Sequence, residues 1–284
     1  MPQSFNAEKY KSTTHDQWQD AAEAWDRWGP LLRSWLGPST QRMLDVAGVG
    51  PGSSVLDVAA GAGDQTLLAA ERVGPTGRVL ATDLSSNILG FALHNAKQAG
   101  LENVETLVAD GENLPVEPES FDAVISRVGL IYFPDQHAAV SSMHKALKPG
   151  GKCAAITYST GDKNGFFSVP VSIIRKRANL PAPLPGQPGP FSLGDPAACE
   201  ALFTGAGFTD VQTEVIDAPV RVPTALECLN FEKESFGALH QLMGGLSEAE
   251  RASVWEEIEA ALNKYQTPEG FVGPCELVLV VGTK

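Results

Sequence analysis

Short apolar segments alternate with amphipathic ones between residues 54 and 158 of this 284-residue chain. The apolar segments have strand length and lie at Ser54–Ala59, Arg78–Thr82, Val104–Val108, Phe121–Ser126 and Lys152–Tyr158. Segments with the length and spacing of helices separate most of them, at Asp64–Val73, Ser86–Ala99 and Asp135–Leu147. Strands that alternate with helices predict βαβ crossovers and a mainly parallel sheet.

The flanking sequence adds helices and two more strands. Residues 17–36 have helical spacing with an interruption at Gly29-Pro30, and a further helix is predicted over Ser39–Val46. Strands are predicted at Val211–Val215 and Leu277–Val281, separated by a helical pattern over residues 222–266. The predicted fold class is therefore α/β, with a Rossmann-like, mostly parallel sheet of seven strands and helices on both faces.

Charge and composition narrow the partners that we expect. The formal net charge is −13 and the isoelectric point is near 4.8, which disfavours nucleic acid and anionic membranes. No apolar run has the length of a membrane span, and the polar N-terminal sequence lacks an apolar signal core, so a cytoplasmic location is expected. The four cysteines are scattered without a CxxC pair, which favours buried thiols and no metal site.

The stretch VLDVAAGAGDQT, residues 55–66, joins a predicted strand to a predicted helix through small residues. Such a turn lets a ligand approach the backbone and the free N–H groups of the helix start. No Gly-Lys-Ser/Thr follows, which excludes a Walker A loop, and Thr66 occupies the third position of the GxGxxG dinucleotide pattern. Asp57 would repel a pyrophosphate, but it could order the loop or receive an ammonium group, directly or through water.

Two further carboxylates follow the next two predicted strands. Asp83 lies about twenty residues after the glycines, where a carboxylate binds ribose hydroxyls. Asp110 ends the third strand and could accept a hydrogen bond from an adenine amine, with the backbone N–H of Gly111 or Glu112 at a ring nitrogen. A ribose, an adenine, a cationic tail and no phosphate together describe S-adenosylmethionine.

In the segments VLDVAAGAGD, LATDLSSNIL, VADGENLPVEPESFDAVISRVGLIYFPD and ALKPGGK the chain resembles the class I S-adenosylmethionine-dependent methyltransferases. The resemblance is to the branch around the ubiquinone/menaquinone C-methyltransferases and the type 11 group, and it covers about residues 50–158. It implies a helical lid over residues 1–48, a cofactor-binding core over 49–160, a Pro/Gly-rich loop over 161–194 and the rest of the core over 195–284, with its helical insertion at about 222–266.

The resemblance also implies roles for individual positions. The expected cofactor-binding residues are Asp57, Ala59, Gly61, Gly63, Asp83, Leu84, Ile88, Asp110, Gly111, Glu112, Arg127 and Val128. Two residues are candidates for catalysis. His15 is either a base above the methyl group or a surface residue that caps a helix, and Tyr132 lies where related enzymes place residues near the acceptor.

A small-molecule acceptor is the expected substrate, because SRVG follows the fourth strand in place of the Asp/Asn-Pro-Pro-Tyr type of motif found in many nucleic-acid amino methyltransferases. The tryptophans at 18, 25, 28 and 35 are expected to pack mainly in a core, with one or two in the acceptor pocket. Two alternatives stay open, namely a nicotinamide-dependent oxidoreductase and a noncatalytic partner subunit that keeps the cofactor fold.

Overall fold

A seven-stranded sheet forms the centre of the computed structural model, which describes residues 5–181, 183–184 and 187–284. Its strands, in spatial order, are β3 (Val104–Val108), β2 (Arg78–Asp83), β1 (Ser54–Val58), β4 (Phe121–Arg127), β5 (Leu147–Tyr158), β10 (Glu276–Thr283) and β6 (Thr209–Asp217). The pairs from β3 to β5 are parallel, whereas β10 runs antiparallel to β5 and β6. The predicted Rossmann-like, mostly parallel sheet of seven strands is confirmed.

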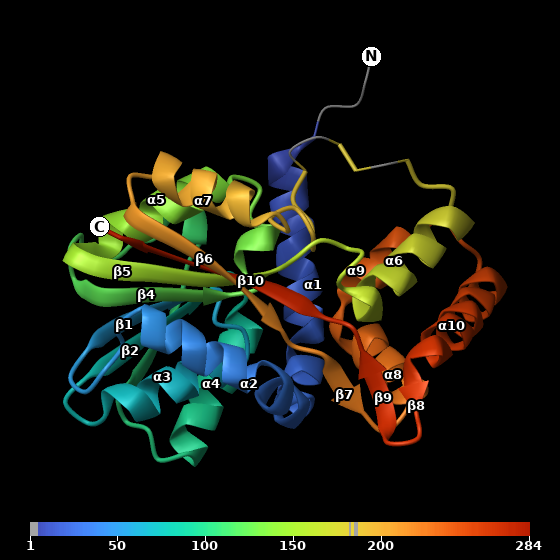
Figure 1. The fold of residues 1–284 in the computed structure, drawn as a ribbon, viewed down its shortest axis with the longest axis horizontal. Coiled ribbons are helices and arrows are strands. Elements are labelled where there is room, and N and C mark those ends of the chain that lie inside the picture. Colours follow the sequence, from blue (N-terminus) through green and yellow to red (C-terminus); the bar gives the residue numbers. More distant parts are fainter. Residues whose placement is uncertain (1–4, 182, 185–186) are drawn as a thin grey trace.

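The inner strands are apolar because helices cover both faces of the sheet (Figure 1), whereas the edge strand β6 is mostly exposed. One face carries α2 (Gly29–Val46), α3 (Asp64–Val73) and α4 (Ser86–Gln98), and the other carries α5 (Gln136–Ala146) and α7 (Pro196–Gly205). Val55, Leu56, Val124 and Ile125 are fully buried in this three-layer arrangement. Their burial explains why the strand signal was strong in the sequence.

The order of the strands creates a crevice at one edge of the sheet. From β1 the chain proceeds outward to β2 and β3, and it then returns to the other side of β1 to form β4. The connections therefore leave β1 and β4 in opposite directions, and ligands bind at such a switch point, outside the carboxyl ends of the strands. Two short helices, η1 (Gly111–Asn113) and η2 (Leu130–Tyr132), follow β3 and β4 at this edge.

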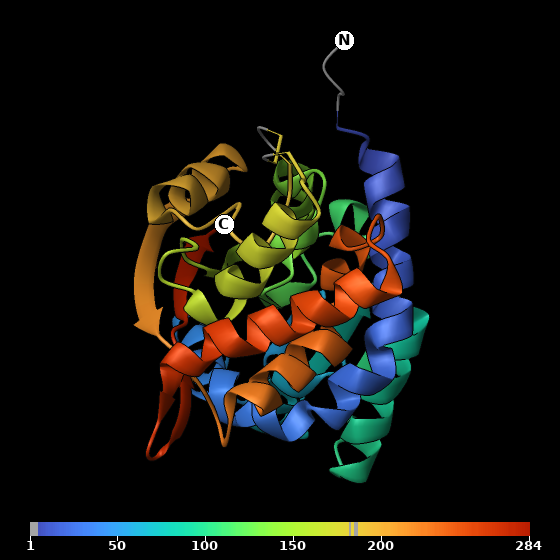
Figure 2. The ribbon, with the colours of Figure 1, turned by 90° about the vertical axis from the view of Figure 1, so that its right-hand side faces the viewer.

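The N-terminal segment forms two helices that meet at the predicted bend. Helix α1 (Ala7–Arg27) begins at Asn6, whose side chain accepts from Lys9 N at 2.9 Å, and α2 begins at Gly29 with Pro30 in its first turn. The prediction of a separate helix over Ser39–Val46 is wrong, because α2 continues through Pro38 to Val46. Helix α1 contacts α4 and α8 (Ala225–Ser235), so it connects the sheet layer with the C-terminal helices (Figure 2).

The segment 161–194, which was expected to be a loop, contains helix α6 (Gly165–Arg177). This expectation was wrong because the apolar residues Phe166, Phe167 and Ile174 are buried, and α6 packs against α9 (Gly237–Leu242) and α10 (Glu248–Leu262). Packing outweighs the cost of Pro170 inside the helix. Residues 182 and 185–186 of the expected loop, and residues 1–4 of the expected lid, lie outside the described residues.

The expected helical insertion at 222–266 comprises α8, α9, α10 and the short helix η3 (Asn263–Tyr265). A small sheet that the sequence did not indicate lies beside these helices, in the order β7 (Val220–Val222), β9 (Gly270–Gly273) and β8 (Gln266–Thr267). An aromatic cluster joins this part to the main sheet, because the Trp35 ring lies 6.5 Å from Tyr158 of β5, 5.2 Å from Phe166 and 6.1 Å from Phe231 of α8.

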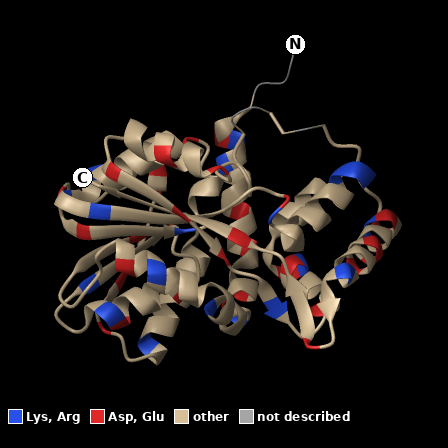
Figure 3. Ribbon diagram, viewed as in Figure 1, with Lys and Arg blue, Asp and Glu red and all other residues tan. Residues whose placement is uncertain are grey.

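Acidic side chains are spread over both parts of the molecule, with several on α10 (Figure 3). This distribution is consistent with 34 acidic against 21 basic residues in the sequence. Over the described ranges, none of the helices combines the length and the apolar character that crossing a membrane requires.

Candidate cofactor and acceptor site

A cavity of about 660 Å³ opens at the carboxyl ends of β1, β2 and β4. Helices α1 and α2 form its other wall, so the N-terminal helices lie over the switch point. Its volume is within the range of about 300–1,000 Å³ that is usual for small-molecule sites. The lining is mostly apolar, with a few polar groups at the strand ends, which is the usual composition of a ligand site.

The turn after β1 has the open backbone that its sequence predicted. Ala59, Gly61 and Gly63 have φ values of 60°, 58° and 90° and line the cavity. A Cβ atom at Gly63 would lie 2.8 Å from the Ala92 Cβ atom, so glycine is required there for close packing of α3 and α4. Ala59 holds a left-handed conformation that is unfavourable for any residue with a Cβ atom, and such strain concentrates at functional sites.

Asp57 lies behind this turn, outside the described lining of the cavity. Its carboxylate is fully buried and accepts hydrogen bonds from Thr66 Oγ1 at 2.6 Å and from Gln65 Nε2 at 3.2 Å. Burial raises the pKa of Asp57 to about 6, and the two hydrogen bonds oppose that rise. Of the two roles that the sequence left open, these contacts fit the ordering of the glycine turn, whereas direct contact with a ligand has no support in the geometry.

Asp83 lies at the end of β2 and lines the cavity. Its carboxylate accepts from Gly61 N and Ser85 N, each at 3.0 Å, and thereby joins the glycine turn to the start of α4. Burial raises the pKa of Asp83, and the backbone N–H groups oppose that rise. Leu84 and Ile88 line the cavity beside it, so the expected ribose carboxylate and its apolar neighbours lie together.

The acidic residues after β3 meet a lysine from the N-terminal helix. Asp110 and Gly111 line the cavity, whereas Glu112 lies outside its described lining. Lys11 Nζ donates to Asp110 Oδ2 at 2.7 Å and also to Glu112 Oε2. A Cβ atom at Gly111 would lie 2.6 Å from the Phe133 ring, so only glycine lets the backbone approach this aromatic residue after η2 so closely. This end of the cavity thus combines acceptors with an apolar surface.

The end of β4 contributes Arg127 and Val128, and both line the cavity. Arg127 Nη1 donates to Asp64 Oδ2 at 2.7 Å and to Thr40 Oγ1 at 2.9 Å, and its side chain is only 5% exposed. Val128 has a φ of 60°, a conformation that a β-branched residue rarely adopts. Two strained residues, Ala59 and Val128, therefore follow the two adjacent strands that flank the switch point.

Aromatic side chains form much of the remaining wall of the cavity. Tyr132, Trp18, Trp25, Phe133 and Phe236 line it, and the rings of Trp18 and Tyr132 lie 5.4 Å apart. Burial raises the pKa of the Tyr132 phenol, which is consequently neutral at physiological pH. An aromatic region of this kind is suited to a planar or apolar ligand.

Two of the four N-terminal tryptophans line the cavity and two do not, in agreement with the sequence analysis. Trp18 and Trp25 face the cavity. Trp28 donates its Nε1 hydrogen to Glu234 at 2.7 Å, and Trp35 donates to the Ala218 carbonyl at 2.6 Å within the core.

His15 lies outside the described lining of the cavity, and its Nδ1 atom is 3.0 Å from Asp16 Oδ1 on the exposed side of α1. This placement fits the surface interpretation of His15 and gives no support to a base above the methyl group. Within residues 5–181, 183–184 and 187–284, no group of three or more His, Cys, Asp or Glu side chains is arranged to hold a metal ion.

Several lining residues were not anticipated from the sequence, above all Lys11, Arg33 and Phe236. Lys11 lies seven residues before Trp18, so both occupy one face of α1, and that spacing was visible in the sequence. Arg33 and Phe236 carried no such signal. Arg33 is an ordinary polar position of α2, and Phe236 reaches the cavity from between α8 and α9, more than one hundred residues after the strands that it faces.

Residues 35–171 match the model of the ubiE/COQ5 methyltransferase family. Over 160 residues the chain is 33% identical to a demethylmenaquinone methyltransferase of Bacillus cytotoxicus, covering 55% of this chain and 66% of that protein. Over 179 residues it is 35% identical to an uncharacterized protein of Mycobacterium tuberculosis, covering 63% of this chain and 60% of the relative. The chain thus spans somewhat less than two thirds of the length of these curated relatives.

Solved structures share the fold at lower sequence identity. The YcgJ protein of Bacillus subtilis superposes with a TM-score of 0.57 at 19% identity, over 87% of this chain and 98% of that one. A phosphoethanolamine N-methyltransferase 2 of Haemonchus contortus, solved with phosphomonomethylethanolamine and S-adenosylhomocysteine, superposes with a TM-score of 0.56 at 20% identity, over 91% of this chain and 57% of that one. At these identities the likeness concerns the fold alone.

Proposed function

Because the chain belongs to the class I S-adenosylmethionine-dependent methyltransferases, of the ubiE type, we propose that it binds S-adenosylmethionine and transfers a methyl group to a small-molecule acceptor. One observation carries the proposal. Asp83 and Asp110, at the ends of adjacent strands, line the same cavity as a glycine turn that lacks the Gly-Lys-Ser/Thr of a Walker A loop. Hydroxyl, amine and cationic groups are the partners of carboxylates, and the proposed cofactor contains all three.

The residues present fit this cofactor. Asp83 supplies acceptors for the ribose hydroxyls, and Asp110 with the Gly111 backbone supplies the polar edge that an adenine needs. Because Gly111 has no Cβ atom, the Phe133 ring can lie close against its backbone and forms an apolar surface beside Asp110. Ala59, Gly61 and Gly63 leave the backbone open beside β1, so a ligand can approach the N–H groups at the start of α3.

The bound cofactor supplies a methyl group that is already activated by its sulfonium. The work of the protein is therefore to hold the acceptor in line with that group and to exclude water. Helices α1 and α2 cover the cavity and thereby exclude water from it. Asp57 contributes indirectly, since its bonds to Thr66 and Gln65 hold the start of α3 beneath the glycine turn.

We further propose that the acceptor is a small, partly aromatic or apolar molecule that lies between Trp18, Trp25 and Tyr132. Tyr132 lines this region beside Trp18 and offers a neutral phenol that hydrogen-bonds and orients the acceptor. The acidic net charge supports a small molecule over a nucleic acid. Demethylmenaquinone is the first acceptor to test, since curated relatives are named for it.

Calorimetry with S-adenosylhomocysteine and with NAD tests cofactor identity. We expect S-adenosylhomocysteine to bind and NAD not to bind, and the reverse result would favour the oxidoreductase alternative. Replacing Asp83→Ala removes charge-assisted hydrogen bonds and should weaken binding by about tenfold to a hundredfold. Glu105→Ala, on the exposed side of edge strand β3, is the matched control and should bind as the wild type does.

Circular dichroism and urea unfolding of both variants separate a binding defect from a folding defect. Unchanged affinity in a folded Asp83→Ala variant would contradict the assignment of the ribose site. Formation of S-adenosylhomocysteine in the presence of acceptor then distinguishes an enzyme from a noncatalytic binder, because a binder would show the calorimetric signal without turnover.

A further inference from the structure

A tyrosine at the end of β5 lines the cavity with a phenol that is free to bind a ligand. Tyr158 is only 1% exposed, and in the part of the chain that the structure describes its hydroxyl has no hydrogen-bond partner. The described polar side-chain atoms that lack both a partner and contact with solvent belong to Ser126, Arg175, Glu232 and Ser235. The Tyr158 oxygen is not one of them, so it is accessible from the cavity. Buried tyrosines normally find a partner, and here a ligand can supply it.

Aromatic neighbours hold the ring of Tyr158 in place. It stacks on Trp35 of α2, with the ring centroids 6.5 Å apart and an angle of 16° between the planes. Phe166 of α6 meets the same ring edge-on at 5.8 Å. Trp35 is itself fixed, because its Nε1 atom donates to the Ala218 carbonyl at 2.6 Å. The phenol is therefore presented by a rigid ring, which reduces the entropy that ligand binding costs.

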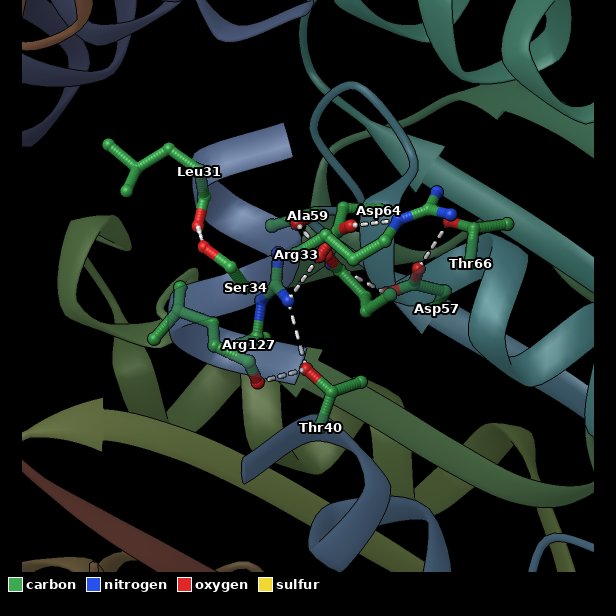
Figure 4. A network of polar contacts seen from close by, with 11 residues as sticks. Leu31, Arg33, Ser34, Thr40, Asp57, Ala59, Asp64, Thr66 and Arg127 are labelled. Atoms are coloured by element: carbon green, nitrogen blue, oxygen red, sulfur yellow. Dashed lines mark hydrogen bonds and ion pairs between the residues drawn. The ribbon is translucent and has the colours of Figure 1, made fainter. Parts of the chain in front are cut away.

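The phenol of Tyr158 keeps its proton at physiological pH. Burial is the main cause, and it raises the pKa of Tyr158 well above the usual value for a phenol. Arg127, at the end of the neighbouring strand β4, opposes this rise, but its Nη1 atom donates to Asp64 and Thr40 (Figure 4). A neutral phenol can donate a hydrogen bond, and the partner that suits it is a carbonyl or hydroxyl oxygen.

The order of the strands places Tyr158 on the acceptor side of the glycine turn. That turn, Asp83 and Asp110 follow β1, β2 and β3, whereas β4 and then β5 extend the sheet from β1 in the other direction. Strands are spaced about 4.8 Å apart, so the end of β5 is about 10 Å from the end of β1. Tyr132, which follows β4, lines the cavity on this side as well. Tyr158 therefore borders the space that the proposed cofactor leaves for the acceptor.

We propose that Tyr158 selects the acceptor, because its phenol donates a hydrogen bond to a carbonyl or hydroxyl oxygen of that molecule. This inference rests on the proposed function and adds to it a residue of β5 and a chemical requirement on the acceptor. A molecule without such an oxygen leaves the phenol unpaired in a mostly apolar region. A site that is built to hydrogen-bond one group discriminates strongly against analogues that lack the group.

A ketone and a hydrocarbon of the same shape test the inference by binding alone. 1-Tetralone is a two-ring aromatic ketone, and tetralin is the same ring system without the oxygen. With S-adenosylhomocysteine present, calorimetry should show that Tyr158→Phe weakens 1-tetralone binding by about threefold to tenfold, as expected for one neutral hydrogen bond, and leaves tetralin within about twofold of wild type. Phenylalanine keeps the ring that stacks on Trp35, so S-adenosylhomocysteine itself should bind this variant as it binds wild type.

Tyr265→Phe is the matched control. Tyr265 lies outside the described lining of the cavity, so both probes should bind this variant as they bind wild type. Equal losses for both probes in Tyr158→Phe, or no loss for either, would overturn the inference alone. A selective loss of 1-tetralone binding in Tyr132→Phe but not in Tyr158→Phe would also overturn it, because the oxygen would then bond to the other phenol.

The wild-type protein separates this inference from the proposals on which it rests. Binding of S-adenosylhomocysteine without binding of either probe would overturn the proposed acceptor region and the role of Tyr158, while leaving the cofactor assignment intact. Failure to bind S-adenosylhomocysteine would overturn the proposed function, and this inference with it.

Discussion

Replacement of Asp57 by asparagine should change how the stability of this protein depends on pH. The Asp57 carboxyl is fully buried, and burial raises its pKa from 3.8 to about 6. The folded state therefore binds a proton more tightly than the unfolded state does. The free energy of unfolding then falls as pH rises from about 3.8 to about 6 and is level above that range. A difference of about two pKa units corresponds to about 3 kcal/mol.

Asparagine removes the charge and can still accept the hydrogen bond that Thr66 Oγ1 donates. The Gln65 amide can rotate so that its oxygen faces the new N–H₂ group. Relative to wild type, Asp57→Asn should therefore gain about 3 kcal/mol of unfolding free energy between pH 3.5 and pH 7. Burial also raises the pKa of Asp83 and of Glu232, which adds slopes of the same sign to both proteins. The difference between the unfolding free energies of the two proteins therefore reports on Asp57 alone.

Urea unfolding followed by circular dichroism, at half-unit pH steps from 3.5 to 7, measures this difference. The matched control is Asp20→Asn, at an exposed position of α1, whose curve should run parallel to the wild-type curve. A difference between Asp57→Asn and wild type that is independent of pH would refute the reasoning. A difference that grows toward low pH would also refute it, because it would mean that the folded state favours the charged carboxylate.

Two further substitutions test the end of the cavity around Asp110. Gly111→Ala places a Cβ atom 2.6 Å from the Phe133 ring. It should lower the free energy of unfolding, measured with urea, by about 1–3 kcal/mol. It should also weaken S-adenosylhomocysteine binding, measured by calorimetry. Gly90→Ala in α4, with open space around the new methyl group, should be neutral or slightly stabilising, and equal effects of the two would contradict the packing argument. Lys11→Met removes the partly exposed bridge from α1 to the acidic residues after β3 and should cost about 1 kcal/mol and speed hydrogen exchange in the first turns of α1. Lys9→Met, at an exposed position of the same helix, should leave exchange unchanged, and identical exchange in both variants would show that the bridge does not hold α1 in place.

Much of the central fold was predictable because its pattern is local. All seven strands of the main sheet were predicted at or near their observed places, since most of them are apolar segments of strand length bounded by turn residues. The small sheet of β7, β8 and β9 was missed because its strands have three, two and four residues, too few for a periodic pattern. Helix α6 was missed for another reason, since the proline and glycine content of its surroundings masked an apolar face.

The residues of the site likewise fall into those that a local sequence pattern reveals and those whose roles depend on the tertiary structure. Residues that follow strand ends, such as Asp83, Asp110 and Val128, were found from the sequence because a parallel sheet brings the ends of its strands to one edge. The sequence left two roles open for Asp57, and only its burial behind the turn favours the ordering role over ligand contact. His15 was likewise a candidate by position alone, and its placement beside Asp16 removes the support for a base.

The sequence by itself determined the alternation of strands and helices, the glycine turn and the acidic groups at the strand ends, because these features depend on neighbours within a few residues. Only the tertiary structure decided which distant groups complete the cavity. Lys11 meets Asp110 across 99 residues, and Arg33 meets Asp64 across 31. Such meetings depend on how the faces of α1 and α2 pack over the sheet, and packing is a property of assembled surfaces that local periodicity does not encode.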